Sequence, residues 1–361
     1  MSSNLGKDIK VQIFGESHGP YIGAVLDGVP SNYIIDEEKI AVQMSRRAPG
    51  KDKASTQRKE SDKVEIVSGI YEGKTTGMPI CGLIKNSDQH STDYSDLLDT
   101  PRPSHADFVA ITKYENFDIR GSGHFSGRLT APITFAGALL RQILDTKGIT
   151  VGGHILSVGE VYDERFNKEN VSKELLQRLN TSSFSVIDES KEELMRKEIE
   201  SARLDCDSVG GSVEIAVTGL PVGIGEPMCR GLESVISAAL FSVPAVKGVS
   251  FGAGFDFCKM RGSKANDTYY YESDKIKVKG NLNGGILGGI STSMPLIITV
   301  ALKPTPSISK EQDTVNLKTH KNTTLKIKGR HDPCIVQRAV APLESAVIIV
   351  LADLMKEGEL I

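Results

Sequence analysis

Tryptophan is absent from the 361-residue chain, aromatic residues make up only 6%, and the five cysteines include no Cys-x-x-Cys pair. Scattered cysteines in odd number argue against a disulfide framework and against a zinc site. No uninterrupted run of about 18 apolar residues occurs, and the N-terminal stretch lacks the basic and apolar segments of a secretion signal. We therefore expect a soluble, cytoplasmic protein with no membrane span and no bound metal.

A strong charge of either sign is also missing. The 43 Lys+Arg against 46 Asp+Glu give a net charge of −3, which argues against a general nucleic-acid binder. Glycine, in contrast, is abundant at 35 residues. Because glycine lets a backbone turn tightly or approach a ligand closely, this richness indicates either many turns or loops around a small molecule. Composition leaves both open.

Hydrophobic periodicity and helix-end signals predict the main elements. Strands are expected at 10–14, 21–26, 213–217 and 295–302, and helices at 40–44, 130–147, twice within 167–208, at 232–241 and from Pro342 through Leu354. Thr130 is expected to cap the first long helix, and Ser190 with Glu193 forms a capping-box pattern. Strands and helices do not alternate as βαβ units. We therefore predict α+β layers in one domain, 1–361, rather than a doubly wound parallel sheet.

A basic segment, 46–59, stands out, with six cations against one Asp. Arginine offers planar, bidentate donors to phosphate or carboxylate, and lysine adds a point charge. The segment is therefore either an anion-binding loop or a solvated surface loop, and the sequence alone does not decide between them.

Two glycine clusters offer a similar choice. Residues 120–128, RGSGHFSGR, precede a predicted helix, and helix N-termini bind anions through backbone N–H groups. The pattern is neither a Walker loop nor a dinucleotide fingerprint, so it predicts an anion loop or a structural turn. Residues 284–289, GGILGG, lead through a strand to the stiff loop 303–307, KPTPS. This loop either binds a polar ligand or is simply the segment by which the chain leaves the strand.

Four of the seven histidines lie in polar loops interrupted by glycine or proline, namely His18, His105, His124 and His331. A histidine titrates near neutrality and can give or take a proton. No HExxH-type spacing of metal ligands occurs. Loops that combine His with Arg and Asp therefore indicate acid–base work on an anionic substrate.

Taken together and in this order, these loops resemble the chorismate synthase family. The matching segments are FGESHG (14–19), LDGVP (26–30), RRAPG (46–50), STQRKESD (55–62), GLIKNSDQ (82–89), RPSHAD (102–107), RGSGHFSGR (120–128), SVGGSVE (208–214), GLPVGIGEP (219–227), FSVPAVKG (241–248), GGILGGIS (284–291), KPTPSI (303–308) and GRHDPC (329–334). Only about 155–205 lacks a matching motif. The combination is specific and spans nearly the whole chain.

The resemblance implies a β-α-β sandwich, with a helical layer between antiparallel sheets, that assembles as a homotetramer. It also implies an anti-1,4-elimination that converts 5-enolpyruvylshikimate 3-phosphate to chorismate and phosphate, at the end of the shikimate pathway. The family requires reduced FMN, although the reaction has no net redox change, and some members reduce their flavin with NADPH. The protein's part is then to position the cofactor and to control protons and charge.

The resemblance also implies roles for individual residues. His18 would neutralise the leaving phosphate, with Ser17 as a proton relay, His105 would protonate the reduced flavin, and Asp332 would serve in removal of the C6 proton. Substrate contacts carry over to Arg47, Lys53 and Arg128. FMN contacts carry over to His124, Phe125, Ser126, Pro244, Ala245, Gly288, Lys303, Pro304, Thr305, Pro306, Ser307 and Arg330.

Three departures from the family pattern qualify these roles. His124 and Phe125 stand where the family commonly has Arg and Ser, so backbone contacts to FMN can persist there but side-chain contacts cannot. Lys53 replaces a usual Arg, and Ser104 replaces the Gly before His105.

Two other functions stay open from sequence. One is an NAD(P)H-dependent flavin reductase, and the other is a non-catalytic binder of a phosphorylated metabolite.

Overall fold

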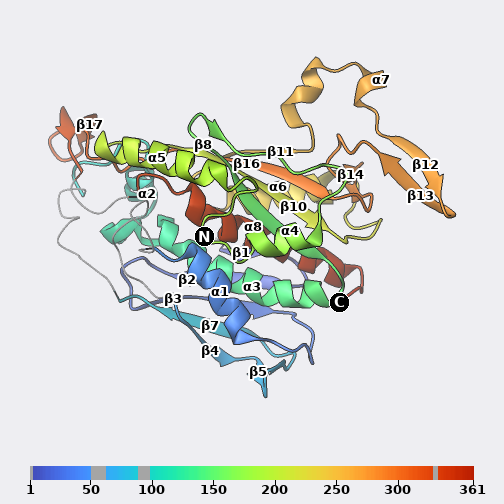
Figure 1. Cartoon of the computed structure of the whole chain (residues 1–361). Coiled ribbons are helices and arrows are strands. Elements are labelled where there is room, and N and C mark those ends of the chain that lie inside the picture. The colour runs from blue at the N-terminus through green and yellow to red at the C-terminus, as the bar shows by residue number, and fades with distance from the viewer. Residues whose placement is uncertain (1–2, 50–61, 88–97, 328–331) are drawn as a thin grey trace.

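Two antiparallel sheets of five strands each enclose a layer of helices in the computed structural model (Figure 1). The structure describes residues 3–49, 62–87, 98–327 and 332–361. The first sheet has the order β1 (Asn4–Leu5), β2 (Lys10–Gly15), β3 (Tyr21–Asp27), β7 (Ile80–Lys85), β4 (Val64–Ser68). The second has the order β11 (Val246–Phe251), β16 (Leu296–Leu302), β10 (Gly211–Thr218), β8 (Thr150–Val158), β9 (Val161–Tyr162).

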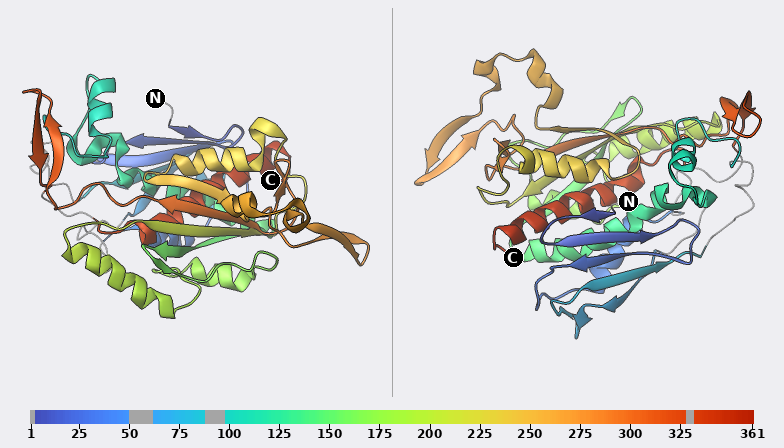
Figure 2. Two further views of the ribbon diagram at one scale, coloured as in Figure 1. Left: turned by 90° about the horizontal axis from the view of Figure 1, so that it is seen from above. Right: turned by 180° about the vertical axis from the view of Figure 1, so that it is seen from behind.

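The inner layer contains α3 (Thr130–Thr146) and α8 (Val336–Glu357), with α1 (Glu37–Arg47) and α6 (Leu232–Phe241) beside them (Figures 1 and 2). Nearly every residue of α3 and α8 is buried. Helices that are apolar around most of their circumference are buried on all sides, and this explains why these two lie between the sheets. The predicted α+β class and its sandwich of sheet, helices and sheet are confirmed.

Two further helices, α4 (Lys173–Leu179) and α5 (Ser190–Leu204), cover the outer face of the second sheet (Figure 2). The prediction of two surface helices in 167–208 is thus confirmed, but the capping box is wrong. Ser190 is already helical, and its backbone N–H is capped by the Asp188 carboxylate at 2.9 Å. Thr130 is likewise no cap, because a 3₁₀ turn over 127–129 precedes α3 and the Thr130 hydroxyl donates to the carbonyl of Gly127.

The C-terminal helix begins at Val336, so the expected start near Pro342 is wrong. Pro342 lies in its second turn, where proline removes one backbone hydrogen bond. Burial of α8 between the two sheets supplies the compensating stability, since packing outweighs propensity for most helices in proteins. The helix expected at 40–44 is longer, 37–47, because Asp36 caps it by accepting from the backbone N–H of Glu38.

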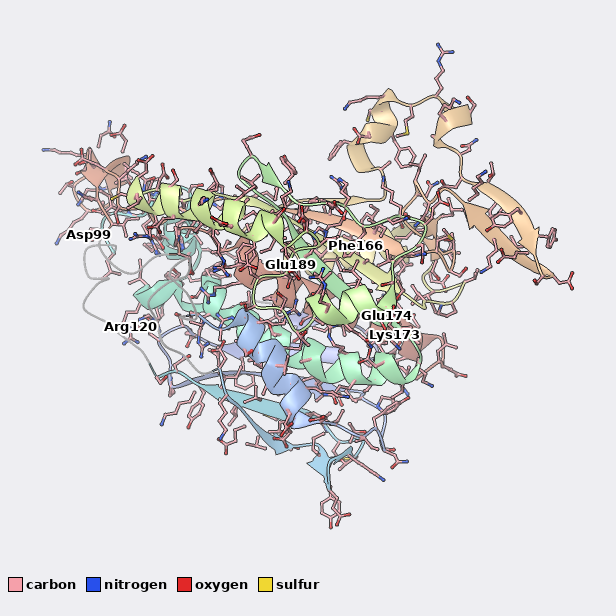
Figure 3. The ribbon with its side chains drawn as sticks, viewed as in Figure 1. Asp99, Arg120, Phe166, Lys173, Glu174 and Glu189 are labelled. Atoms are coloured by element: carbon pink, nitrogen blue, oxygen red, sulfur yellow. The ribbon has the colours of Figure 1, made fainter. Side chains whose placement is uncertain are left out.

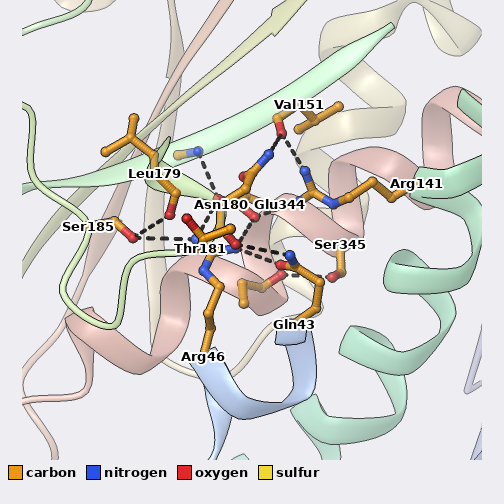
Figure 4. A network of polar contacts seen from close by, with 12 residues as sticks. Gln43, Arg46, Arg141, Val151, Leu179, Asn180, Thr181, Ser185, Glu344 and Ser345 are labelled. Carbon is orange, nitrogen blue, oxygen red and sulfur yellow. Dashed lines mark hydrogen bonds and ion pairs between the residues drawn. The ribbon is translucent and has the colours of Figure 1, made fainter. Parts of the chain in front are cut away.

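A buried ion-pair network crosses the helical layer (Figure 4). Glu344 of α8 accepts from Arg46 of α1 at 2.7 and 2.9 Å and from Arg141 of α3 at 2.7 Å. Its carboxylate also accepts from the backbone N–H of Gly153 in β8 at 2.8 Å. Arg46, the first cation of the basic segment, is therefore neither a ligand residue nor a solvated one. Glu344, its partner, joins α1 and α3 to α8 and to the second sheet.

One hairpin projects from the body of the molecule, built from β12 (Thr268–Glu272) and β13 (Lys275–Lys279) next to α7 (Gly262–Ala265) (Figures 1 and 2). It exposes Tyr269, Tyr270, Tyr271 and Ile276, with 77% of Tyr271 accessible. The remaining short elements are β5 (Ile70–Tyr71), β6 (Lys74–Thr75), α2 (Asp107–Lys113), β14 (Ile286–Leu287), β15 (Ile290–Ser291), β17 (Gln312–Asn316) and β18 (Lys321–Leu325). Among the residues that the structure describes, no helix is long and apolar enough to cross a membrane.

Candidate active site

The predicted site residues gather mainly at one end of the sandwich, the end at which α3 and α8 begin. Arg120 is the first residue of the segment 120–128, which we call the glycine-rich loop. Both Arg120 and Asp99 lie at this end of the molecule, far from Lys173 and Glu174 of α4 (Figure 3). In the parts of the chain that the structure describes, no group of three or more His, Cys, Asp or Glu side chains could hold a metal ion.

The loop between β2 and β3 carries Ser17 and His18, each only 5% exposed. The glycine-rich loop packs directly against it, since the backbone N–H of Ser17 donates to the carbonyl of Gly123 at 3.1 Å. A Cβ atom at Gly121 would lie 2.4 Å from His18 Nδ1, and Gly121 has a φ of +54°. Both the space and the backbone conformation therefore require glycine there. The Ser126 hydroxyl donates to the Ser17 hydroxyl at 3.2 Å.

His105 lies on the other side of the glycine-rich loop, in a cluster with Arg102, Asp107 and Ser122. Its Nδ1 is 2.8 Å from Asp107, and its Nε2 is 3.3 Å from the hydroxyl of Ser122. The guanidinium group of Arg102 donates twice to Asp107, at 2.7 Å each, and once to Ser122 at 2.7 Å. Burial alone would raise the pKa of Asp107, but hydrogen bonds from Arg102 and His105 hold this pKa well below its ordinary value. Asp107 is thus a permanent carboxylate that fixes the imidazole ring.

A separate group of side chains, the arginine cluster, consists of Arg47, Arg128 and Asp62 and includes two of the predicted substrate arginines. Asp62 accepts from both Arg47 and Arg128, and all three side chains are nearly inaccessible. Burial would raise the pKa of Asp62, but the two guanidinium charges lower it. Counted over the described residues of this cluster, one carboxylate lies between two arginines, at the end of the sandwich where His18 also lies. The basic segment thus contributes a buried cation at Arg47, not a solvated one.

Asp332, just before α8, is ion-paired with Arg338 at 2.5 Å. The Nε of Arg338 also donates to the backbone carbonyl of Arg47 at 3.1 Å. This arginine therefore brings Asp332 close to the arginine cluster. Lys53, Arg330 and His331, which the sequence also singled out, lie outside the described residues.

The loop 303–307 borders the His105 cluster. The Lys303 ammonium donates to the carbonyl of Ser104 at 2.7 Å, and Arg102 donates to the Ser307 hydroxyl at 3.2 Å. Burial, with a smaller contribution from Lys247, lowers the pKa of Lys303. The backbone N–H of Lys303 donates to the carbonyl of Ala245 at 3.0 Å, so the predicted cofactor contacts at 244–245 and 303–307 are neighbours.

The structure shows what surrounds three further residues of the predicted cofactor set. The His124 ring is held by the protein itself, with Nδ1 2.9 Å from the carbonyl of Gly15 and Nε2 2.9 Å from the hydroxyl of Ser3. Phe125 packs on Tyr114 and Phe117. The GGILGG segment lies at the start of β16, because the backbone N–H of Ile297 donates to the carbonyl of Gly284 at 3.3 Å. Lys303 follows the other end of this seven-residue strand, whose length is roughly 20 Å. Gly288 and the 303–307 loop thus belong to segments at opposite ends of β16.

Sequence reasoning missed the residues that hold the expected ones in place, namely Asp62, Asn86, Arg102, Asp107, Ser122 and Arg338. Five of these six lie within the quoted motifs STQRKESD, GLIKNSDQ, RPSHAD and RGSGHFSGR. Charged or amide side chains inside a motif were thus a signal that could have been followed. Arg338 lies outside every motif, and only the start of α8 places it.

Comparisons with known proteins agree with one another. The family model described as "Chorismate synthase" matches residues 9–355. A chorismate synthase of Methanocaldococcus jannaschii is 44% identical and aligns over 99% of this chain and 97% of its own. One of Dehalococcoides mccartyi is 46% identical over 98% of this chain and 96% of its own.

A solved structure titled "Crystal Structure of Chorismate Synthase" superposes with a TM-score of 0.76 at 27% identity, covering 98% of this chain and 93% of that one. Fold, full-length sequence and the set of loops at the site therefore all point in the same direction. This chain belongs to the chorismate synthase family, lyases that act in the shikimate pathway to the aromatic amino acids.

Proposed function

We propose that this chain eliminates phosphate and the C6 proton from 5-enolpyruvylshikimate 3-phosphate to form chorismate, in the presence of reduced FMN. The observation that carries the proposal is the arrangement of His18 and His105 on either side of one glycine-rich loop, next to the buried arginine pair Arg47 and Arg128. A mere binder of a phosphorylated metabolite needs cations and N–H donors, not two histidines held in this way.

The arginine cluster would bind the anionic substrate. Its surplus positive charge is preorganised, because Asp62 fixes both guanidinium groups before a ligand arrives. The substrate carries a phosphate and two carboxylates, and charge-assisted hydrogen bonds are the strongest that arginine makes to such groups. Lys53 would add a further cation. Fixed donors also stabilise charge that develops on the leaving phosphate.

His18 would act as the acid that neutralises the departing phosphate. Its burial against Gly121 holds the ring in one place, which general acid catalysis requires. The hydroxyls of Ser17 and Ser126, 3.2 Å apart, offer a proton path beside it. Asp332 would accept the C6 proton, and its ion pair with Arg338 would hold the carboxylate in place.

The residues around 303–307 fit a flavin phosphate or ring edge. Of the described residues there, Thr305 has a buried hydroxyl with no hydrogen-bond partner in the protein, and Lys303 and Arg102 supply cationic donors close by. We assign FMN contacts to this loop, to Pro244 and Ala245, to Ser126 and the backbone of 124–125, and to Arg330.

When bound, reduced FMN would lend electron density to the substrate as phosphate leaves. His105 would lie beside this cofactor as its proton donor, with Asp107 orienting the imidazole ring.

We further propose a homotetramer of a single domain, 1–361, in the cytoplasm. A single continuous core runs through both sheets and the helical layer, which supports one domain. The projecting β12–β13 hairpin exposes three tyrosines and an isoleucine, and surfaces of this kind support contact with another copy. Gly288 would then contact FMN across such an interface, since its segment and Lys303 lie at opposite ends of β16.

An anaerobic assay tests the proposed function. Purified protein is mixed with 5-enolpyruvylshikimate 3-phosphate and chemically reduced FMN, and chorismate absorbance and released phosphate are followed in parallel. Oxidised FMN and NADPH plus FMN are the comparison arms. Equal amounts of chorismate and phosphate, formed only with reduced flavin, are expected. NADPH-driven bleaching of FMN without chorismate would instead indicate a flavin reductase, and substrate binding without any turnover would indicate a binding protein.

A further inference from the structure

Asn86 connects two parts of the site that the proposed function assigns to different tasks. It follows β7 directly and is 7% exposed. Its Oδ1 accepts from Arg128 Nε at 3.0 Å. Its Nδ2 donates to the carbonyls of Glu16 and Gly19, at 3.1 and 2.7 Å. One amide group thus contacts a predicted substrate arginine on one side and the His18 loop on the other.

The two carbonyls that Asn86 holds lie on either side of Ser17 and His18. The backbone N–H of Asn86 also donates to the carbonyl of Pro20 at 3.1 Å, which continues the pairing of β3 with β7. The short loop is therefore tied to β7 at both of its ends. A group that delivers a proton must be held to within about 0.5 Å of its working position, and this amide supplies that restraint from behind the loop.

The orientation of the amide follows from its partners. A guanidinium group has only donors, so the Asn86 oxygen must face Arg128; carbonyls only accept, so the NH₂ group must face Glu16 and Gly19. Arg128 is held from a second direction by Asp62. No other side chain of the same size offers an acceptor and two donors in this geometry, and aspartate in particular lacks the donors.

We infer that Asn86 is a positioning residue that couples the anion-binding Arg128 to the acid His18. Binding of a substrate anion at Arg128 and placement of the His18 ring then share one rigid link. This inference rests on the proposed function, in which Arg128 binds substrate and His18 protonates the leaving phosphate. It assigns a role to GLIKNSDQ, a motif to which the resemblance gave no task.

Asn86→Asp is the sharpest test, because the side chain keeps its size and its acceptor for Arg128 but loses both donors to the loop. We expect kcat to fall roughly 10- to 100-fold, as a small misplacement of a reacting group does, while KM changes little. That split marks an interaction used in the transition state rather than in substrate binding. Asn86→Gln, which keeps the amide but displaces it by one methylene, should give a smaller loss of kcat and serves if Asn86→Asp does not fold.

Thr75→Val is the matched control. The Thr75 hydroxyl is buried in the same half of the molecule, donates to the carbonyl of Pro30 at 2.7 Å and accepts from the backbone N–H of Tyr33 at 2.9 Å. It lies beyond the opposite end of β3 from Asn86. The control should lower the midpoint of thermal unfolding as Asn86→Asp does, yet leave kcat and KM unchanged.

Two kinetic results would overturn the inference. A lower unfolding midpoint with unchanged kcat and KM would make Asn86 a structural residue only. A higher KM with unchanged kcat would show that it serves Arg128 alone. The wild-type arm of the same assay reports separately on the proposed function.

A readout without turnover keeps the coupling testable if the wild type forms no chorismate. The protein is labelled with ¹³C at histidine Cε1, the His18 resonance is assigned with His18→Gln, and inorganic phosphate is titrated in. A shift of that resonance in the wild type that is lost in Asn86→Asp supports the coupling. The same shift in both proteins overturns it.

Discussion

Two neighbouring residues of α1, Arg46 and Arg47, have the same kind of partner in different surroundings. Each pairs with a buried carboxylate that also holds a second arginine, Glu344 with Arg141 in one case and Asp62 with Arg128 in the other. In each cluster two positive charges face one negative charge. Charge arithmetic alone does not separate structure from function here.

The surroundings separate them. Glu344 lies among three helices and β8, and the arginines around it also donate to Gln43 and to the carbonyl of Val151 within the core (Figure 4). Asp62 lies at the end of the sandwich, where its arginines meet Asn86, Thr130 and the loop before α3. Removing one partner of a buried ion pair is strongly destabilising, but only the second cluster lies beside the proposed histidines. Substitutions can test this distinction.

The largest effect is expected from Glu344→Gln. It leaves two buried guanidinium groups without their counter-charge, and the free energy of unfolding should fall by about 3–5 kcal/mol. Denaturant-induced unfolding measures this loss, and turnover per folded molecule should stay close to that of the wild type. A variant as stable as the wild type would mean that Glu344 does not hold the helical layer together.

His105→Ala comes next and extends the comparison to a third cluster, in which a histidine takes the place of the second arginine. Turnover at saturating reduced FMN should fall roughly 100-fold, the size of general acid–base effects, while the dissociation constant for FMN stays the same. Flavin fluorescence titration and the anaerobic assay measure the two quantities. Equal turnover of mutant and wild type would remove His105 from the mechanism.

Arg47→Met should raise the KM for 5-enolpyruvylshikimate 3-phosphate by roughly 10- to 100-fold, because it removes charge-assisted hydrogen bonds worth about 1.5–3 kcal/mol. Arg46→Met, one residue away, is the matched control and should lower stability with little change in KM. If both substitutions raise KM equally, the two clusters are not functionally distinct.

The smallest effect concerns the pH dependence of stability. The pKa of Asp62 is lowered by its two arginines, so the unfolded chain binds the proton more readily than the folded one. The stability that Asp62 contributes is therefore fully present above its ordinary pKa of about 4 and is lost as the pH falls through the lower folded value. Asp62→Asn should flatten the acid limb of a plot of unfolding free energy against pH. An unchanged acid limb would contradict the buried pairing.

The sequence predicted those features that depend on local patterns. Strands at 10–14 and 21–26 and the helix at 130–147 follow from periodicity, and the structure has them within a residue or so. Pro342 misled the reading of the last helix, because tertiary burial outweighs the local preference. The cap at Ser190 failed since an aspartate two residues earlier was the better acceptor.

The site was predictable where a motif carries its own chemistry and not where a contact joins distant segments. His18, His105 and Arg128 could be named from their motifs, and the structure brings them to one end of the molecule. Asp62 and Asn86 touch partners that are 15 to 70 residues away, and no local pattern encodes those pairings. Gly288 illustrates the converse, since its motif matches the family but does not tell that it belongs to a segment at the other end of β16 from Lys303.

The contact between Gly121 and His18 has a consequence for how this gene tolerates change. Codon 121 should accept almost no substitution, because even one methyl group falls on the imidazole ring. Gly127, six residues further on, faces open space at the same atom, so alanine or serine should be accepted there. In a library of variants selected for growth without aromatic amino acids, Gly121 would thus be nearly invariant and Gly127 variable, although both glycines belong to the same glycine-rich loop.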